Sequence, residues 1–95
     1  MAKFEKNQCG IEAVKATYKP PTTVSVTVKN TGTCPVTVSL GREGASAERA
    51  SGQSDPEDAD PLILQATKVE QVLIACGSAA SENPKCSFEY KLTAG

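Results

Sequence analysis

Alternating hydrophobic and polar residues dominate the middle of the chain. Residues 22–29 (TTVSVTVK) place three valines on one face, and residues 34–40 (CPVTVSL) repeat the pattern. Period-two alternation of β-branched residues is typical of half-buried strands. A three-residue loop, Thr31–Thr33, would pair the two strands as a hairpin with matching faces, and Gly32 in this loop can adopt a positive φ. Alternatively, the two strands lie in opposite sheets and both face inward.

Three further segments complete the predicted architecture. Residues 85–93 (KCSFEYKLT) alternate as plainly as the central strands. Residues 68–76 (KVEQVLIAC) also predict a strand, although a helix starting at Leu62 fits the same apolar positions. Residues 10–18 form a weaker strand pattern that stops at Pro20–Pro21. Five to eight short strands with little helix indicate an all-β fold, a small β-sandwich or jelly roll.

A chain of 95 residues holds one core, which we expect to be thin. Leu, Ile, Val and Phe supply only 18 residues, so cross-links or neighbouring molecules are expected to add stability. We predict a flexible N-terminal leader or connector at residues 1–9 and a single β-sandwich domain at residues 10–95. The predicted core residues share the inward face of the alternating segments: Val24, Val26, Val28, Val36, Val38, Leu40, Ile74, Phe88, Tyr90 and Leu92.

Residues 43–61 contain no apolar side chain larger than alanine. They predict an exposed, mobile loop, and a protein partner could bind there. Four carboxylates near the end of this segment are candidate Ca²⁺ ligands, but their spacing departs from that of an EF-hand. We therefore expect a solvated turn and no metal site at these residues: Asp55, Glu57, Asp58 and Asp60.

Composition excludes several classes of function. The chain has no histidine, which excludes imidazole catalysis, and a nucleophilic Cys76 or Cys86 would have no such base to activate it. We therefore expect that the protein is not an enzyme and binds no cofactor. The net charge of −1 and the pI near 5.4 argue against nucleic-acid binding, and no apolar run approaches the ~18 residues of a membrane span. Residues 1–42 carry a net charge of +4 and residues 43–95 a net charge of −5, which would favour head-to-tail self-association unless folding interleaves the two halves.

Four cysteines in so short a chain predict a disulfide framework and an oxidising destination: Cys9, Cys34, Cys76 and Cys86. Cys34 and Cys76 both lie on inward faces at strand ends, so they are the first choice for a bridge within the chain. A monomeric module would instead close Cys76–Cys86 and Cys9–Cys34. The opening residues MAKFEKNQCG lack the apolar stretch of a signal peptide. Either a signal has been replaced, or cell lysis delivers the protein to an oxidising surface.

Two stretches, VKNTGTCPVTVSL and VLIACGSAASENPKCSFEYKL, resemble the core strands of endospore appendage (Ena-type) subunits. The resemblance implies a jelly roll that polymerises into spore-surface fibres, with an N-terminal connector that forms disulfides to another subunit. By position, Cys9 resembles the connector cysteine and Cys86 the acceptor on the last strand, which implies a Cys9–Cys86 bond between subunits. The NTG-containing strand also resembles exported immunoglobulin-like modules.

Three hypotheses follow from these patterns. The first is a structural subunit that self-assembles into a disulfide-linked surface fibre, a homo-oligomer or polymer located outside the cell or on the spore or cell surface. The second is a secreted immunoglobulin-like binding module that contacts a protein partner through residues 43–61. The third is a phage capsid decoration protein.

Overall fold

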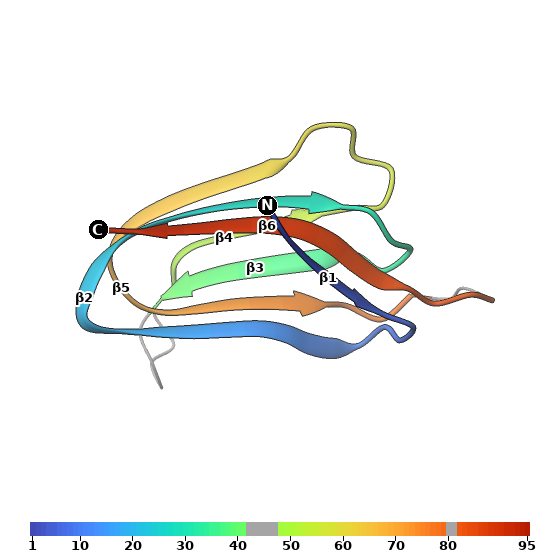
Figure 1. The fold of residues 1–95 in the computed structure, drawn as a ribbon, viewed down its shortest axis with the longest axis horizontal. Coiled ribbons are helices and arrows are strands. Elements are labelled where there is room, and N and C mark those ends of the chain that lie inside the picture. Colours follow the sequence, from blue (N-terminus) through green and yellow to red (C-terminus); the bar gives the residue numbers. More distant parts are fainter. Residues whose placement is uncertain (42–47, 80–81) are drawn as a thin grey trace.

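The protein consists of β-strands joined by turns (Figure 1). The computed structural model describes residues 1–41, 48–79 and 82–95, and none of these residues is helical. The strands are β1 (Ala2–Lys6), β2 (Ile11–Asn30), β3 (Val36–Gly41), β4 (Glu48–Ser54), β5 (Leu62–Cys76) and β6 (Cys86–Ala94). The all-β prediction is confirmed, and the helix considered from Leu62 is wrong because that segment belongs to β5.

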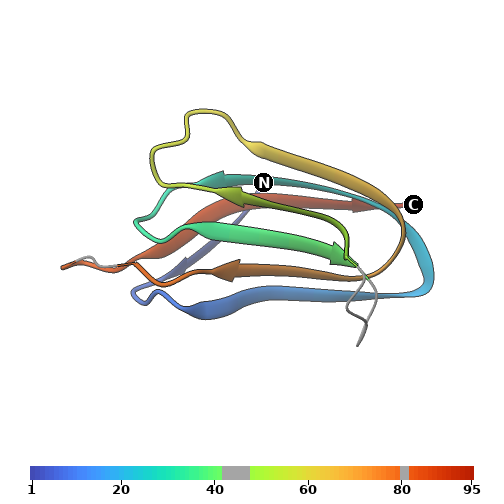
Figure 2. The same cartoon turned by 180° about the vertical axis from the view of Figure 1, so that it is seen from behind.

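The six strands form one antiparallel network of order β1-β6-β2-β5-β3-β4. The two long strands, β2 and β5, run through both halves of this network, which is bent into two layers. The first half of β2 pairs with the second half of β5, which also pairs with β3. The second half of β2 pairs with the first half of β5 and with β6. Figures 1 and 2 show both strands curving from one layer into the other at the end where the C-terminus lies. The result is a small sandwich.

The bend in β2 lies at the two prolines that the sequence marks as a strand end. The β2–β5 register shifts between Thr17 and Thr22 and again before Val24. Pro20 and Pro21 have no N–H group to donate, so the ladder cannot continue through them. The strand therefore turns the corner here and resumes as the valine-rich segment. In β5, Lys68 has a φ of 54° near the same bend.

The core lies between the layers and follows the predicted alternation. Eight of the ten predicted core side chains are fully or almost fully buried, whereas Tyr90 and Leu92 are only partly buried. Tyr90 is the last residue of β6 that pairs with β1, and Leu92 lies beyond the end of that ladder. This part of β6 therefore has fewer neighbouring residues. Other residues complete the buried cluster: Val69, Val72, Cys34, Cys76 and Cys86.

The hairpin predicted for residues 22–40 is wrong, and the alternative of opposite layers is confirmed. The end of β2 pairs with β6, and β3 pairs with β4 and β5. The connecting residues run alongside the start of β6, where the Thr31 N–H donates to Ser87 O and the Thr33 N–H to Lys85 O. These bonds take the place of a hairpin turn and carry the chain from one layer to the other.

The segment expected to be a flexible leader contains a strand. Residues of β1 pair antiparallel with β6, from Ala2 opposite Tyr90 to Lys6 opposite Cys86. The Phe4 ring stacks on Phe88, with 5.4 Å between ring centroids. One aromatic side chain thus supplies the apolar contact that fixes an otherwise polar segment.

The loop predicted at residues 43–61 is partly wrong, because β4 lies within it. Residues 43–47 of that prediction lie outside the described residues. The strand forms without large apolar side chains because β3 supplies its backbone partners, from Val36–Ser54 to Leu40–Ala50. Its small residues allow close packing: a Cβ at Gly52 would lie 2.9 Å from Leu62 Cδ1. Residues 55–60 are exposed, as predicted.

Candidate functional site

The end of β5 and the start of β6 lie at the end of the sandwich opposite the C-terminus (Figure 1). The cysteines are located at this end. They form two bridges within the chain, Cys9–Cys34 and Cys76–Cys86, with Cα–Cα distances of 5.6 and 5.9 Å. Cys76 ends β5 and Cys86 begins β6, so the second bridge ties the two layers together. We call this end of the molecule, with residues 7–10, 30–35, 76–77 and 82–87, the clamped pole.

The structure corrects two expected pairings. Cys34 and Cys76 both face the core as predicted, but the β3–β5 ladder places Val36, not Cys34, opposite Cys76. Cys34 bonds to Cys9 instead, and Cys86 bonds to Cys76, so the Cys9–Cys86 link between subunits implied by the family resemblance is not formed. The observed pairing is the one expected of a monomeric module.

Asn30 connects three segments at the clamped pole. Its side-chain Nδ2 donates to Cys34 O at 2.7 Å and to Ser54 O at 2.9 Å, and its Oδ1 accepts from the Gly32 N–H at 2.9 Å. The residue is only 6% exposed. The amide therefore satisfies three backbone groups, from the β2–β3 connection and from the end of β4, where water has little access. Sequence reasoning treated this asparagine only as part of a turn.

Gly32 is required by a close approach of two backbones. A Cβ at this position would overlap Lys85 O and would lie 2.7 Å from Ser87 N. Its φ is not among the positive values of the described glycines, so the positive φ considered from the sequence is not the reason for glycine here. The side chains around it complete the contact, since Thr31 Oγ1 lies 2.6 Å from Ser87 Oγ and Thr33 Oγ1 accepts from the Lys85 N–H at 2.8 Å.

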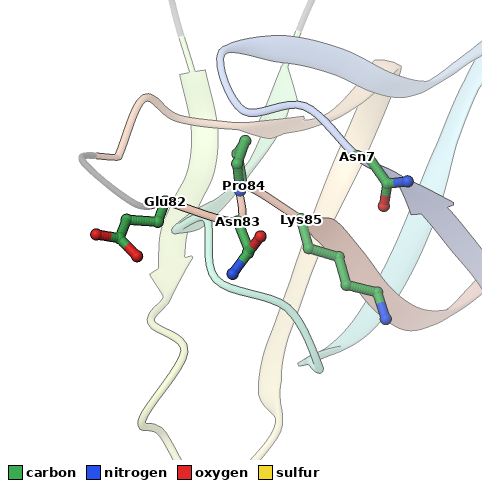
Figure 3. A pocket seen from close by; sticks show the side chains of 5 residues that line it. All are labelled: Asn7, Glu82, Asn83, Pro84 and Lys85. Atoms are coloured by element: carbon green, nitrogen blue, oxygen red, sulfur yellow. The ribbon is translucent and has the colours of Figure 1, made fainter.

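A shallow hollow of about 330 Å³ lies on the surface of the clamped pole (Figure 3). It is lined by Asn7, Glu82, Asn83, Pro84 and Lys85, whose side chains are amides, one carboxylate, one ammonium group and one proline ring. Lys85 Nζ also lies 3.7 Å from Glu5 Oε2, and both side chains are about half exposed. The hollow contains no thiol or hydroxyl nucleophile among its lining residues.

The acidic residues before β5 form a turn that uses its own carboxylates. The Asp55 N–H donates to Asp58 Oδ2 at 2.8 Å, and the Asp58 N–H donates to Asp55 O at 3.0 Å. Gln53 Nε2 donates to Asp55 Oδ1 at 2.6 Å. Within the described ranges, no three His, Cys, Asp or Glu side chains come together as a metal site. The same ranges contain no helix long and apolar enough to cross a membrane.

Comparison with known proteins adds no relative. A scan of protein-family models, a search of curated proteins and a search of solved structures each found no match. The class is therefore defined by the molecule itself: a small β-sandwich with two intrachain disulfides, which is compatible with an extracellular structural module.

Proposed function

We propose that the protein is an extracellular structural subunit that assembles with copies of itself into a surface fibre and catalyses no reaction. The observation that carries self-assembly is that β1 and β4, the two ends of the strand order, are open edges of the sheet. The two disulfides, which close within the chain and clamp one pole of the sandwich, support the part of the proposal that concerns a durable extracellular module. Small domains with lean cores gain stability from such bridges in oxidising surroundings. Because all four cysteines are used, contacts between subunits in the proposed fibre are non-covalent.

Open sheet edges supply a means of assembly. The strand order begins with β1 and ends with β4, and each has a hydrogen-bonding side that no other described strand covers. Unpaired edges accept strands of other chains. The clamped pole keeps the two layers in fixed positions, so the edges are presented in a constant geometry.

The resemblance of two stretches to endospore appendage subunits supports the choice of a fibre and of a spore or cell surface. Surface fibres need durable subunits and no catalytic groups.

Negative-stain electron microscopy of the oxidised protein tests the proposal. We expect fibres whose material runs as a monomer in a denaturing gel without reductant, with an alkylating agent present to prevent disulfide exchange. Particles that remain monomeric and separate at millimolar concentration would refute self-assembly and favour the secreted binding module. A ladder of covalent oligomers would contradict the intrachain pairing.

A further inference from the structure

The edge strand β1 has a self-complementary sequence. Its five residues, AKFEK, pair with β6 on one side, and β1 is the last strand on that side of the network. The other side carries backbone N–H and C=O groups that no described strand pairs. An edge of this kind binds another strand when the side chains are compatible.

We infer that β1 pairs antiparallel with β1 of a second copy, about a two-fold axis at Phe4. In this register Phe4 faces Phe4 of the second copy, and Lys3 faces Glu5. The two-fold axis repeats the Lys3–Glu5 pair on both sides of the phenylalanines. Residues directly opposite each other in an antiparallel pair point to the same face, so both charge pairs lie on the outer face of the sheet.

Existing ladders extend this charge pattern across the sheet. Lys29 of β2 lies opposite Glu89 of β6, and Glu89 lies opposite Lys3 of β1. Glu5 of the second copy would be next, so that positive and negative side chains alternate through four strands. Within one chain, Lys3 Nζ is already 3.5 Å from Glu5 Oε2, which shows that the two charges lie on the same face. Opposite charges on neighbouring strands stabilise a sheet, and like charges destabilise it.

The inner face of β1 offers an apolar contact at the same point. Phe4 is partly buried and stacks on Phe88, which in turn lies 5.6 Å from the Tyr90 ring. Pairing at the two-fold axis would place the Phe4 rings of the two copies next to each other and extend this aromatic row. Cross-strand aromatic pairs are among the more stabilising contacts of a sheet.

The first half of β2 is an edge of the other layer but is less suited to pairing. Its ladder to β5 is irregular between Glu12 and Val14. An extra residue twists an edge away from other strands. The β1–β6 ladder has no such shift.

The β1 dimer is one interface of the self-assembly proposed above and in that sense rests on it. Five residues form a small contact, so we expect a dissociation constant in the micromolar to millimolar range. A two-fold contact closes as a dimer, so a fibre would need a second interface at another edge of the subunit. Nothing beyond a second copy of the chain is required.

Sedimentation equilibrium over a wide concentration range tests the inference with the full chain, tagged only at its C-terminus. Lys3→Glu places two carboxylates opposite each other on either side of the axis, and Glu5→Lys places two ammonium groups there. Each variant should weaken dimerisation by at least about tenfold. The double variant Lys3→Glu/Glu5→Lys restores opposite charges across the axis. In both this variant and Lys3→Glu the new carboxylate also faces Glu89 of its own chain, so the comparison between the two isolates the contact across the axis, and the double variant should dimerise at least about threefold more tightly than Lys3→Glu. Lys91→Glu is the matched control for Lys3→Glu, because it makes the same change of net charge on β6 at a residue that β1 does not pair with.

Circular dichroism verifies that each variant is folded. A protein that stays monomeric at millimolar concentration would overturn the β1 register. So would a single reversal that dimerises normally, or a double variant that dimerises no more tightly than Lys3→Glu. Fibres that persist in the single variants would overturn it while leaving the proposed function intact. A protein that forms the β1 dimer but shows no fibres in the microscope would refute the proposed fibre and leave the β1 register intact.

Discussion

Replacing Asn30 by alanine should be among the most destabilising polar substitutions in the protein. The change removes two hydrogen bonds donated by Nδ2 and one accepted by Oδ1. A hydrogen bond of this kind contributes about 0.5–1.5 kcal/mol net, and leaving a buried partner unsatisfied adds to the loss. For three bonds we expect a decrease of roughly 2–4 kcal/mol in the free energy of unfolding. For a domain of this size that corresponds to a melting temperature lower by roughly 10–25 °C.

Asn30→Asp tests the contribution of the hydrogen bonds separately from that of the side-chain volume. Aspartate has nearly the same shape and keeps an acceptor for the Gly32 N–H, but it cannot donate to the carbonyls of Cys34 and Ser54. Its carboxylate would instead face two carbonyl oxygens in a buried position, which raises the free energy of the folded state further. We therefore expect Asn30→Asp to be at least as destabilising as Asn30→Ala.

Chemical denaturation without reductant measures these changes, because the disulfides must stay closed in both states. Asn7→Ala is the control, since Asn7 is exposed and should change the unfolding free energy by less than about 0.5 kcal/mol. The role assigned to Asn30 would be refuted by an alanine variant as stable as the control. An aspartate variant clearly more stable than the alanine variant would show that shape, and not hydrogen bonding, is what matters.

Three further predictions concern the core and the clamped pole. Phe88→Ala removes a fully buried ring stacked on Phe4 and should cost about 3–5 kcal/mol in unfolding experiments, whereas Ile63→Ala, at a side chain 67% exposed, should cost less than about 0.5 kcal/mol. Gly32→Ala should destabilise the protein by roughly 1–3 kcal/mol because the new Cβ meets the Lys85 backbone. Gly77→Ala is the control and should cost less, because the nearest neighbour of its Cβ is Pro35 Cγ at 3.3 Å; equal costs would contradict the close-approach argument. Mild reduction followed by alkylation and peptide mapping should label Cys9 and Cys34 first, because Cys9 is partly exposed while Cys76 and Cys86 are buried; initial labelling of the Cys76–Cys86 pair would disagree with the structure.

Period-two alternation explains why the sequence predicts the core so well. A valine at every second position can bury only one face of a strand, and Val24, Val26 and Val28 are accordingly at most 1% exposed. The same pattern does not name the partner of a strand. Residues 22–29 and 34–40 match as a hairpin and match equally well as members of opposite layers. The choice is made by hydrogen bonds from Thr31 and Thr33 to β6 and the residue before it, which are distant in sequence.

The remaining differences between the predicted and the observed structure arise where the hydrophobic alternation gives no signal. The strand β4 has no large apolar residue, so its pairing with β3 leaves no hydrophobic signature in ERASGQS. Disulfide connectivity depends on which strand ends share a pole, and this follows from the layer assignment that the pattern leaves open. Asn30 and Gly32 belong to a motif that reads as a turn, and their roles become visible only when β6 and the end of β4 are placed beside them.

The clamped pole also bears on the proposed β1 dimer. Only four residues separate the end of β1 at Lys6 from the start of β2 at Ile11, and Cys9 within this connection is bonded to Cys34. The start of β6 is tied to β5 by Cys76–Cys86, directly opposite Lys6 in the β1–β6 ladder. Both strands that define the edge are thus covalently fixed beside the site of pairing. A five-residue edge can bind a second copy only if little conformational freedom is lost on association. The disulfides reduce that loss in advance, so they would contribute to assembly through the rigidity of the subunit and not through bonds between subunits.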